Sequence, residues 1–289
     1  MPNDGQITAG EDLRLDTLLV RRGFAAGRER AKELLAAGTV TVNGRPVSKA
    51  SARVRPTDEV VCRAPAPRYV GRGGYKLEKV LHGRRLDGTV CIDVGASTGG
   101  FTDCMRQNGA AHVYAVDVGR NQLHRSLRDD PAVTPLEGTD IRSPQLSSVL
   151  PAHGAGLIVI DVSFISLTYV LPAVLPYLRP DGTVVCLIKP QFEAGRAAIG
   201  KRGVVRDPRV HRRVLDTLLA FFPSCGLTVG ELTYSPITGG EGNIEYLAVL
   251  HPDDAPSAAP PVPFPTDKLV AEAFSALRRT DEERGSPDV

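Results

Sequence analysis

The sequence has few of the features that mark secreted, membrane-spanning or metal-binding proteins. It has no tryptophan, and its five cysteines are scattered without a C-x-x-C pair that would suggest a zinc site. No apolar run approaches the roughly 18 residues that a membrane-spanning helix needs. The first residues, M-P-N-D-G-Q, lack the basic-then-apolar order of a secretory signal. We therefore expect a cytoplasmic protein with reduced thiols, no membrane association and no metal.

Charge is nearly balanced overall but unevenly distributed. The formal net charge of the 289 residues is +2. Residues 1–90 hold 17 Lys and Arg against 10 Asp and Glu, a surplus of 7, and the remainder holds 18 against 23, a deficit of 5. A basic first third favours a polyanionic partner for that part, although a solvated basic helix surface would have the same composition.

The basic N-terminal part has the pattern of a small α+β domain. Apolar residues at helical spacing predict helices over 13–22 and 28–37, each followed by a glycine. T-V-T-V-N-G-R-P-V at 39–47 predicts two strands joined by an Asn-Gly turn, and 58–62 predicts a third strand. The basic residues of the two helices are Arg14, Arg21, Arg22, Arg28, Arg30 and Lys32.

The stretch C-I-D-V-G-A-S-T-G-G-F, from Cys91 to Phe101, predicts a strand, a tight loop and a helix. Such a loop faces the end of its strand, where doubly wound proteins bind nucleosides. Gly95, Gly99 and Gly100 have the spacing G-x-x-x-G-G and not the G-x-G-x-x-G of dinucleotide sites, which disfavours an NAD-dependent dehydrogenase. The spacing suits an adenosine ligand without phosphates, such as S-adenosylmethionine, but an ordinary glycine-rich turn would look the same.

Strands and helices alternate beyond this loop. Further strands are predicted at 112–118, 132–136, 156–161, 183–189, 227–234 and 243–250, and helices at 75–81, 168–178, 208–222 and 268–279. This alternation predicts an α/β fold with a doubly wound, mostly parallel seven-stranded sheet. The glycine-rich, basic residues 190–206 predict a long substrate-facing loop.

Charged side chains occur at or just past the ends of five predicted strands. They are Asp93, Asp117, Asp140, Asp161 and Lys189. Each aspartate alone could be an ordinary turn or cap residue. Because parallel strands end at one edge of a sheet, the five together predict a site there, with Asp117 suited to accept hydrogen bonds from ribose hydroxyls. A lysine directly after the apolar run V-V-C-L-I is unusual on structural grounds.

Longer motifs resemble a known family. R-L-D-x-L-L-V-x-R-G and V-x-V-N-G within residues 12–62 resemble an S4 RNA-binding domain. Behind it, D-V-G-A-S-T-G-G-F-T, D-V-S-F-I-S-L, K-P-Q-F-E and G-N-x-E-Y resemble the TlyA family, which is similar to FtsJ-type RNA ribose methyltransferases. The resemblance implies an S4-like domain at 1–62, a linker at 63–67, a Rossmann-like methyltransferase domain at 68–252, and a Pro/Ala-rich linker with a terminal helix at 253–289.

The resemblance also implies an activity and its partners. It indicates S-adenosylmethionine-dependent 2′-O-methylation of cytidine in ribosomal RNA of one or both subunits. Another structured RNA such as transfer RNA, or a non-catalytic RNA-binding role at the ribosome, are the alternatives. The family's "hemolysin" label would imply a pore, for which the sequence offers no membrane-spanning segment. Family members from mycobacteria have Arg-Ala-Trp-Pro between the domains where this chain has Arg-Ala-Pro-Ala, so coupling through that segment stays open.

The resemblance assigns site residues by motif. The catalytic set falls on Lys76, Asp161, Lys189 and Glu245. The predicted cofactor residues are Asp93, Gly95, Ala96, Ser97, Thr98, Gly99, Gly100, Phe101, Asp117, Val118, Asp140, Ile141 and Phe164. The predicted RNA-binding residues are the six basic residues of the N-terminal helices.

The chemistry of ribose methylation suits the predicted catalytic set. A 2′-hydroxyl is a poor nucleophile, and a deprotonated amine close to it could act as general base. We assign Lys189 as this base or hydroxyl-activating group and Lys76 as its cationic neighbour. The two carboxylates would orient the lysines. Without the family, Lys76 would be interpreted as an ordinary solvated helix lysine.

Overall fold

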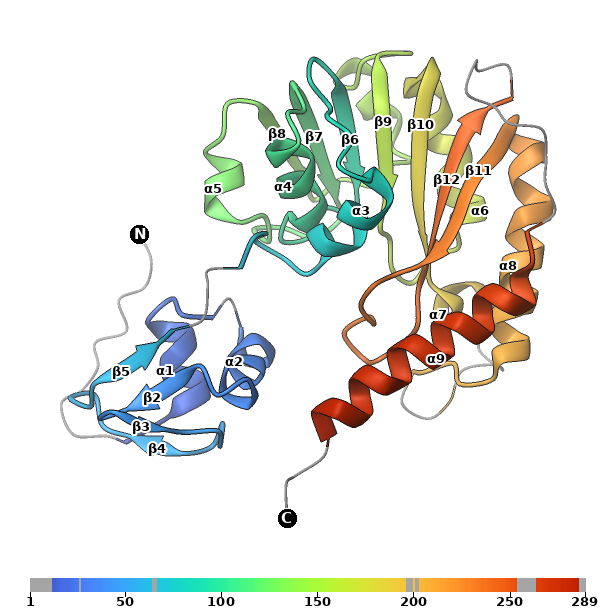
Figure 1. Ribbon diagram of the computed structural model, residues 1–289. Helices are drawn as coiled ribbons and strands as arrows, with labels where there is room; N and C mark the ends of the chain where they lie inside the picture. The colour runs from blue at the N-terminus through green and yellow to red at the C-terminus, as the bar shows by residue number, and fades with distance from the viewer. Residues whose placement is uncertain are drawn as a thin grey trace. The chain divides into compact units, whose positions relative to one another are not determined.

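The computed structural model describes residues 12–25, 27–63, 67–195, 200, 203–253 and 264–285. The chain divides into two compact units, Met1–Arg68 and Tyr69–Val289, each of which is described by itself (Figure 1). Most of the predicted linker at 63–67 lies outside the described residues, as do most of the Pro/Ala-rich linker and part of the predicted loop at 190–206.

The described residues of the first unit form two helices and five short strands. They are β1 (Leu13–Arg14), α1 (Leu15–Arg21), α2 (Arg28–Ala36), β2 (Val40–Val42), β3 (Arg45–Pro46), β4 (Arg53–Val54) and β5 (Val60–Cys62). The predicted hairpin is confirmed: β2 pairs with β3, and the turn residues Asn43 and Gly44 have φ of 51° and 76°, as a type I′ turn requires. The predicted helix start at residue 13 was wrong, because β1 pairs with the unpredicted β4.

The core of the first unit comes from one face of each helix. Leu15, Leu18 and Leu19 of α1 are buried against Ala31 and Leu35 of α2, at the i, i+3, i+4 spacing of an amphipathic helix. The apolar faces therefore pack together, and the basic residues are left on the solvent side.

The second unit is a doubly wound α/β domain. Its helices are α3 (Gly73–Leu81), α4 (Gly100–Gln107), α5 (Arg125–Arg128), α6 (Leu167–Val174), α7 (Pro190–Glu193), α8 (Pro208–Phe221) and α9 (Thr266–Gly285). Its strands are β6 (Val90–Val94), β7 (His112–Asp117), β8 (Val133–Glu137), β9 (Ala155–Ile160), β10 (Leu178–Ile188), β11 (Leu227–Tyr234) and β12 (Tyr246–Pro252).

These strands form one seven-stranded sheet in the order β11-β12-β10-β9-β6-β7-β8. Strand β12 is antiparallel to both of its neighbours, and the other neighbouring pairs are parallel. The predicted mostly parallel sheet is confirmed. Because β12 is reversed, its first residues lie at the edge where the parallel strands end, which matters for Glu245 just before it.

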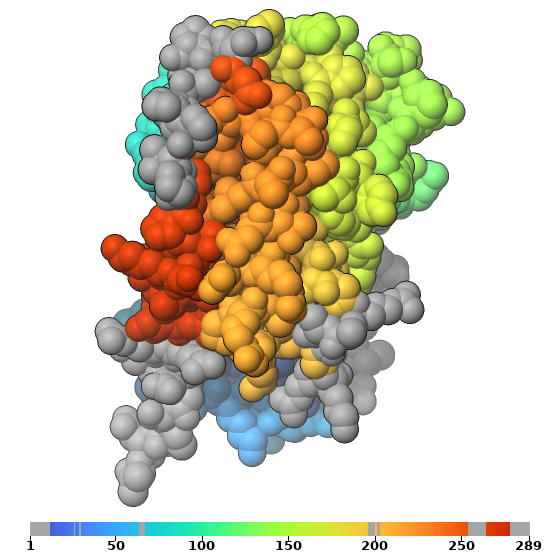
Figure 2. Space-filling model, turned by 90° about the vertical axis from the view of Figure 1, so that its right-hand side faces the viewer, coloured from blue at the N-terminus to red at the C-terminus, as the bar shows by residue number. Residues whose placement is uncertain are grey.

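The sheet is buried on both faces because its strands are apolar at successive positions. Leu157 and Val159 of β9 face the core formed with α3 and α4, whereas Ile158 and Ile160 face the core formed with α6 and α8. Figure 1 shows α3 and α4 on one face of the sheet. On the other face, α9 lies along α8 and buries Val270 there (Figure 2).

Two predicted boundaries were wrong for reasons connected with proline. The helix predicted at 168–178 ends at Val174, and a 3₁₀ turn with Pro176 follows before β10 begins at Leu178. The predicted loop at 190–206 begins with the short helix α7, whose first residue is Pro190. This helix begins directly after Lys189. No helix among the described residues is long and apolar enough to cross a membrane.

Candidate active site

Two hollows lie at the carboxyl edge of the sheet. The first, which we call the lysine hollow, has a volume of about 640 Å³ and is lined by all four predicted catalytic residues, Lys76, Asp161, Lys189 and Glu245. The second, which we call the loop hollow, has a volume of about 480 Å³ and is lined by residues that follow β6, β7, β8 and β9. The fold therefore brings together residues that are far apart in the sequence.

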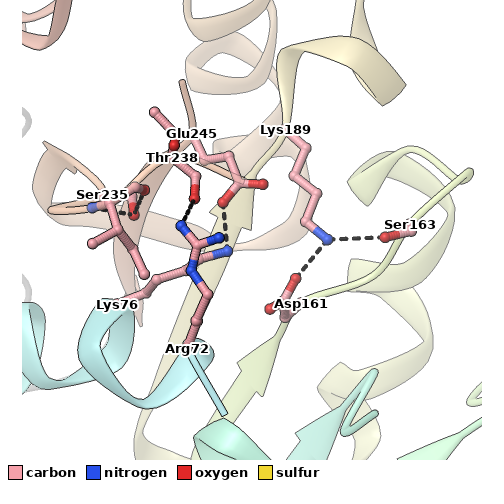
Figure 3. A network of polar contacts seen from close by, with 9 residues as sticks. Arg72, Lys76, Asp161, Ser163, Lys189, Ser235, Thr238 and Glu245 are labelled. Atoms are coloured by element: carbon pink, nitrogen blue, oxygen red, sulfur yellow. Dashed lines mark hydrogen bonds and ion pairs between the residues drawn. The ribbon is translucent and has the colours of Figure 1, made fainter. Parts of the chain in front are cut away.

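Lys189 is held by two partners at the end of β9. Its Nζ lies 2.6 Å from Oδ1 of Asp161 and donates a hydrogen bond to Oγ of Ser163 at 3.0 Å (Figure 3). The side chain is only 10% exposed. Lys189 directly follows β10 and therefore lies at the edge of the sheet, and α7 begins at the next residue.

Lys76 forms the second ion pair. Its Nζ lies 2.6 Å from Oε2 of Glu245, and the two side chains are 10% and 3% exposed (Figure 3). The interpretation of Lys76 as a solvated helix lysine is therefore wrong. Leu77, Val80 and Leu81 bury the same helix against the sheet, which holds Lys76 at the edge of the hollow.

Two further basic residues bind the end of β11 and the segment that follows it. One, Arg72, directly precedes α3, and the other, Lys79, lies within α3. Arg72 donates to the carbonyl of Thr238 at 2.9 Å, and Lys79 donates to the carbonyl of Tyr234 at 2.6 Å (Figure 3 shows the first). Burial lowers the pKa of Lys79. Neither residue was predicted as a site residue, although their i−4 and i+3 spacing from Lys76 places all three on one helix face.

The D-V-S-F-I-S-L and K-P-Q-F-E motifs are bound to each other. The Glu193 carboxylate accepts hydrogen bonds from the Ser166 hydroxyl at 2.6 Å and from the Leu167 amide at 2.9 Å. Burial raises the pKa of Glu193. The rings of Phe164 and Phe192 lie 4.8 Å apart between their centroids. The loop after β9 is therefore fixed against α7.

Asn243 and Gln191 line the lysine hollow but were not predicted as site residues. The Asn243 side chain accepts from the Val205 amide and donates to the Gly203 carbonyl, both at 3.0 Å, so it joins two segments that line the lysine hollow. Gln191 also lines this hollow, is buried, and its Oε1 has no hydrogen-bond partner among the described residues. The G-N-x-E-Y and K-P-Q-F-E motifs contain both residues and were the available signal.

The loop hollow contains about half of the predicted cofactor residues. They are Gly95, Ser97, Asp117, Val118, Asp140, Ile141 and Phe164. The Asp117 carboxylate accepts hydrogen bonds from the Ser97 amide at 2.8 Å and the Gly119 amide at 2.6 Å. Arg142, which was not predicted, binds Asp140 through its guanidinium and lowers the pKa of that carboxyl.

The other predicted cofactor residues lie beside this hollow without lining it: Asp93, Ala96, Thr98, Gly99, Gly100 and Phe101. A Cβ at Gly99 would lie 2.3 Å from a Leu127 methyl, and one at Gly100 would lie 3.0 Å from the Gly71 carbonyl oxygen. These glycines therefore permit close packing within the protein, and their predicted part in cofactor binding stays a prediction. The Phe101 ring is buried in the core.

Gly95 and Asp93 lie at the end of β6, where the strand meets the loop hollow. Gly95 has φ of 88°, and a Cβ there would lie 2.3 Å from the backbone oxygen of Asp161. Asp93 is fully buried and accepts a hydrogen bond from the Thr102 hydroxyl at 2.6 Å. Burial raises the pKa of Asp93 to about 7.

The two hollows meet at three shared residues. Asp161, Ser163 and Phe164 line both of them. Phe164 is 90% exposed and has φ of 66°, a left-handed conformation that is uncommon for a bulky residue and that occurs at functional sites. The two hollows are therefore adjacent at these three residues, and Lys189 lines the lysine hollow beside them. No cluster of metal-binding side chains occurs among the described residues.

Comparison with known proteins places the chain in a family. The model of FtsJ-like methyltransferases matches residues 69–251, and that of the S4 domain matches residues 13–60. The chain belongs to the FtsJ-like methyltransferase family. The resemblance noted from its motifs is confirmed, and the family match covers most of the second unit.

Several relatives align with this chain over most of its length. A Bacillus subtilis protein with the provisional name rRNA methyltransferase YqxC is 45% identical over 82% of this chain and 85% of its own. The Mycobacterium tuberculosis protein named 16S/23S rRNA (cytidine-2'-O)-methyltransferase TlyA is 41% identical over 82% and 89%. The structure of a Streptococcus thermophilus protein with a provisional hemolysin name is 42% identical, with a TM-score of 0.73 over 94% of this chain and 98% of that one.

Proposed function

We propose that this protein transfers a methyl group from S-adenosylmethionine to the ribose 2′-hydroxyl of a cytidine in ribosomal RNA. The observation that carries the proposal is the pairing of Lys189 with Asp161 and Ser163 where the two hollows meet. The family match and the names of the relatives support the reaction type and the RNA class.

The loop hollow suits S-adenosylmethionine. Its volume of about 480 Å³ lies within the range of small-molecule sites, and it combines apolar walls with a few polar groups. Asp117 would accept hydrogen bonds from the ribose hydroxyls, and Val118 and Ile141 would pack against the adenine. When bound, the cofactor supplies an electrophilic methyl group.

The lysine hollow would receive the target ribose. The Lys189 amine is paired with Asp161 and donates to Ser163, which leaves a third position on the nitrogen for the 2′-oxygen. In its neutral form, with its lone pair at that third position, Lys189 would take up the hydroxyl proton as the oxygen reacts, and the ammonium so formed would stay paired with Asp161. Lys76 adds positive charge to the same hollow, while Glu245 and Asp161 balance the two ammonium groups. Placement of the oxygen where the hollows meet is a proximity effect.

The S4 unit would bind RNA through its exposed basic residues. Arg14 is bound to the Asp16 carboxylate, Arg22 donates to the Pro56 carbonyl, and Arg30 pairs with Glu33. These three positions are thus already engaged in the fold.

Arg21 and Arg28 are exposed and have no such contact among the described residues. We expect Arg21→Glu and Arg28→Glu to weaken RNA binding more than Arg14→Ala does. Each lost phosphate contact should reduce the slope of log affinity against log salt by about 1. Equal effects at all three positions would contradict the assignment.

The test of the activity is single-turnover methyl transfer to ribosomal RNA from cells that lack the protein, followed by mapping of 2′-O-methylcytidine. Lys189→Ala should reduce the rate by about 10²–10⁴-fold, the usual cost of losing a general base. Lys189→Arg should fail as well, because an arginine does not lose its proton near neutral pH. Near-normal turnover with Lys189→Arg would exclude Lys189 as the base.

Two controls separate binding from chemistry. Lys268→Ala removes an exposed lysine of α9 and should leave the rate unchanged. Titration calorimetry should show binding of S-adenosylmethionine by the wild type and by Lys189→Ala. Preference for NAD would contradict the cofactor assignment.

A further inference from the structure

We propose that Ser163 is a positioning residue for Lys189 in the methyl transfer, an inference that rests on the proposed function. Its Oγ accepts a hydrogen bond from the Lys189 amine at 3.0 Å, and its side chain lines both hollows. With Asp161 as its only partner, the amine of a flexible lysine side chain could rotate about that one contact. The hydrogen bond to Ser163 is a second contact, and it fixes the orientation of the amine.

The position of Ser163 is itself determined by contacts on both sides. Before it, Asp161 follows β9, and its backbone amide donates to the Val94 carbonyl at 2.8 Å. After it, Ser166 and Leu167 are held by the Glu193 carboxylate of α7, the helix that begins directly after Lys189. The serine and the lysine are therefore fixed relative to each other by the same short helix.

The direction of the hydroxyl follows from its role as acceptor. Because Oγ accepts the Lys189 proton, the hydrogen of the Ser163 hydroxyl points elsewhere. Ser163 is exposed at the place where the hollows meet, so both its hydroxyl and the third position of the amine are accessible to a substrate oxygen. Removal of the Ser163 hydroxyl should leave the Lys189 amine in the hollow but with a less defined orientation toward the substrate oxygen.

The experiment is a double-mutant cycle read by single-turnover methyl transfer to ribosomal RNA. Ser163→Ala should slow the step by about 10- to 100-fold, the cost of a misplaced group, with unchanged affinity for RNA and for S-adenosylmethionine. Ser163→Thr keeps the hydroxyl at an exposed position and should retain most of the rate. In the Lys189→Ala background, Ser163→Ala should change the residual rate by less than about twofold, because residues that act as a unit are not additive.

Ser224→Ala is the matched control. Its exposed hydroxyl donates to the Phe221 carbonyl and lines neither hollow, so its removal should leave the rate unchanged in the wild-type and Lys189→Ala backgrounds. Near-normal turnover with Ser163→Ala, or a loss that persists in full without Lys189, would overturn the inference while leaving the proposed function intact. Absence of methyl transfer by the wild type would overturn both.

Discussion

The buried ion pair between Lys76 and Glu245 gives a prediction that separates stability from catalysis. Nζ and Oε2 are 2.6 Å apart, and the side chains are 10% and 3% exposed. At an effective dielectric constant of about 20, two unit charges at this separation attract by about 6 kcal/mol, most of which offsets their removal from water. Loss of one partner leaves the other charge buried. We expect Lys76→Met or Glu245→Met to lower the free energy of unfolding by about 3–5 kcal/mol.

The double variant should behave differently from the sum of the single ones. With both charges replaced by apolar side chains of similar length, no unpaired charge remains, and the free energy of unfolding should return to within about 1 kcal/mol of the wild type. Methyl transfer should nevertheless stay at least about 10²-fold reduced in all three variants. Urea unfolding followed by circular dichroism measures the stabilities, since the chain has no tryptophan for fluorescence.

An exposed pair provides the comparison. Arg125, the first residue of α5, pairs with Asp129 directly after the helix, and the two side chains are 83% and 63% exposed. Arg125→Ala should therefore change the free energy of unfolding by less than about 0.5 kcal/mol. If the double variant were as unstable as the two single variants added together, Lys76 and Glu245 would not be coupled. If it regained activity as well as stability, the pair would have no part in catalysis.

Three other substitutions test the packing beneath the site. Gly95→Ala introduces a Cβ 2.3 Å from the Asp161 backbone oxygen at a φ of 88°, and should lower stability by about 2–3 kcal/mol in thermal unfolding; an unchanged midpoint would contradict the close approach. Asp93→Asn removes a carboxyl whose pKa is raised from 3.8 to about 7. The folded protein holds that proton more tightly, so wild-type stability should fall relative to the variant by about 3 kcal/mol from pH 4 to pH 7, and parallel curves would refute this. Asn243→Ala removes two hydrogen bonds to backbone groups and should cost about 2–3 kcal/mol with slower methyl transfer, whereas full activity would show that the joined segments do not shape the hollow.

Much of the architecture could be predicted because the signals are local. The continuous apolar run of β9 and the helical spacing of α1 are both signals that lie within one element. The Asn43-Gly44 turn follows from the φ that a type I′ turn demands. The predictions failed where pairing at a distance decided the outcome, as for β1, whose two residues become a strand only through β4.

Motifs in the sequence by themselves pointed to the four charged residues that line the lysine hollow, but only the tertiary structure decided what each one contacts. Lys76 and Glu245 are separated by 169 positions, and they meet because the reversed β12 begins at the edge where β6, β9 and β10 end. Likewise, Gly99 and Gly100 could be recognised as special but not assigned to packing, since the side chain and backbone that approach them belong to α5 and to the turn before α3. Local spacing determines which elements form, whereas the contacts between distant residues depend on the order and direction of the strands.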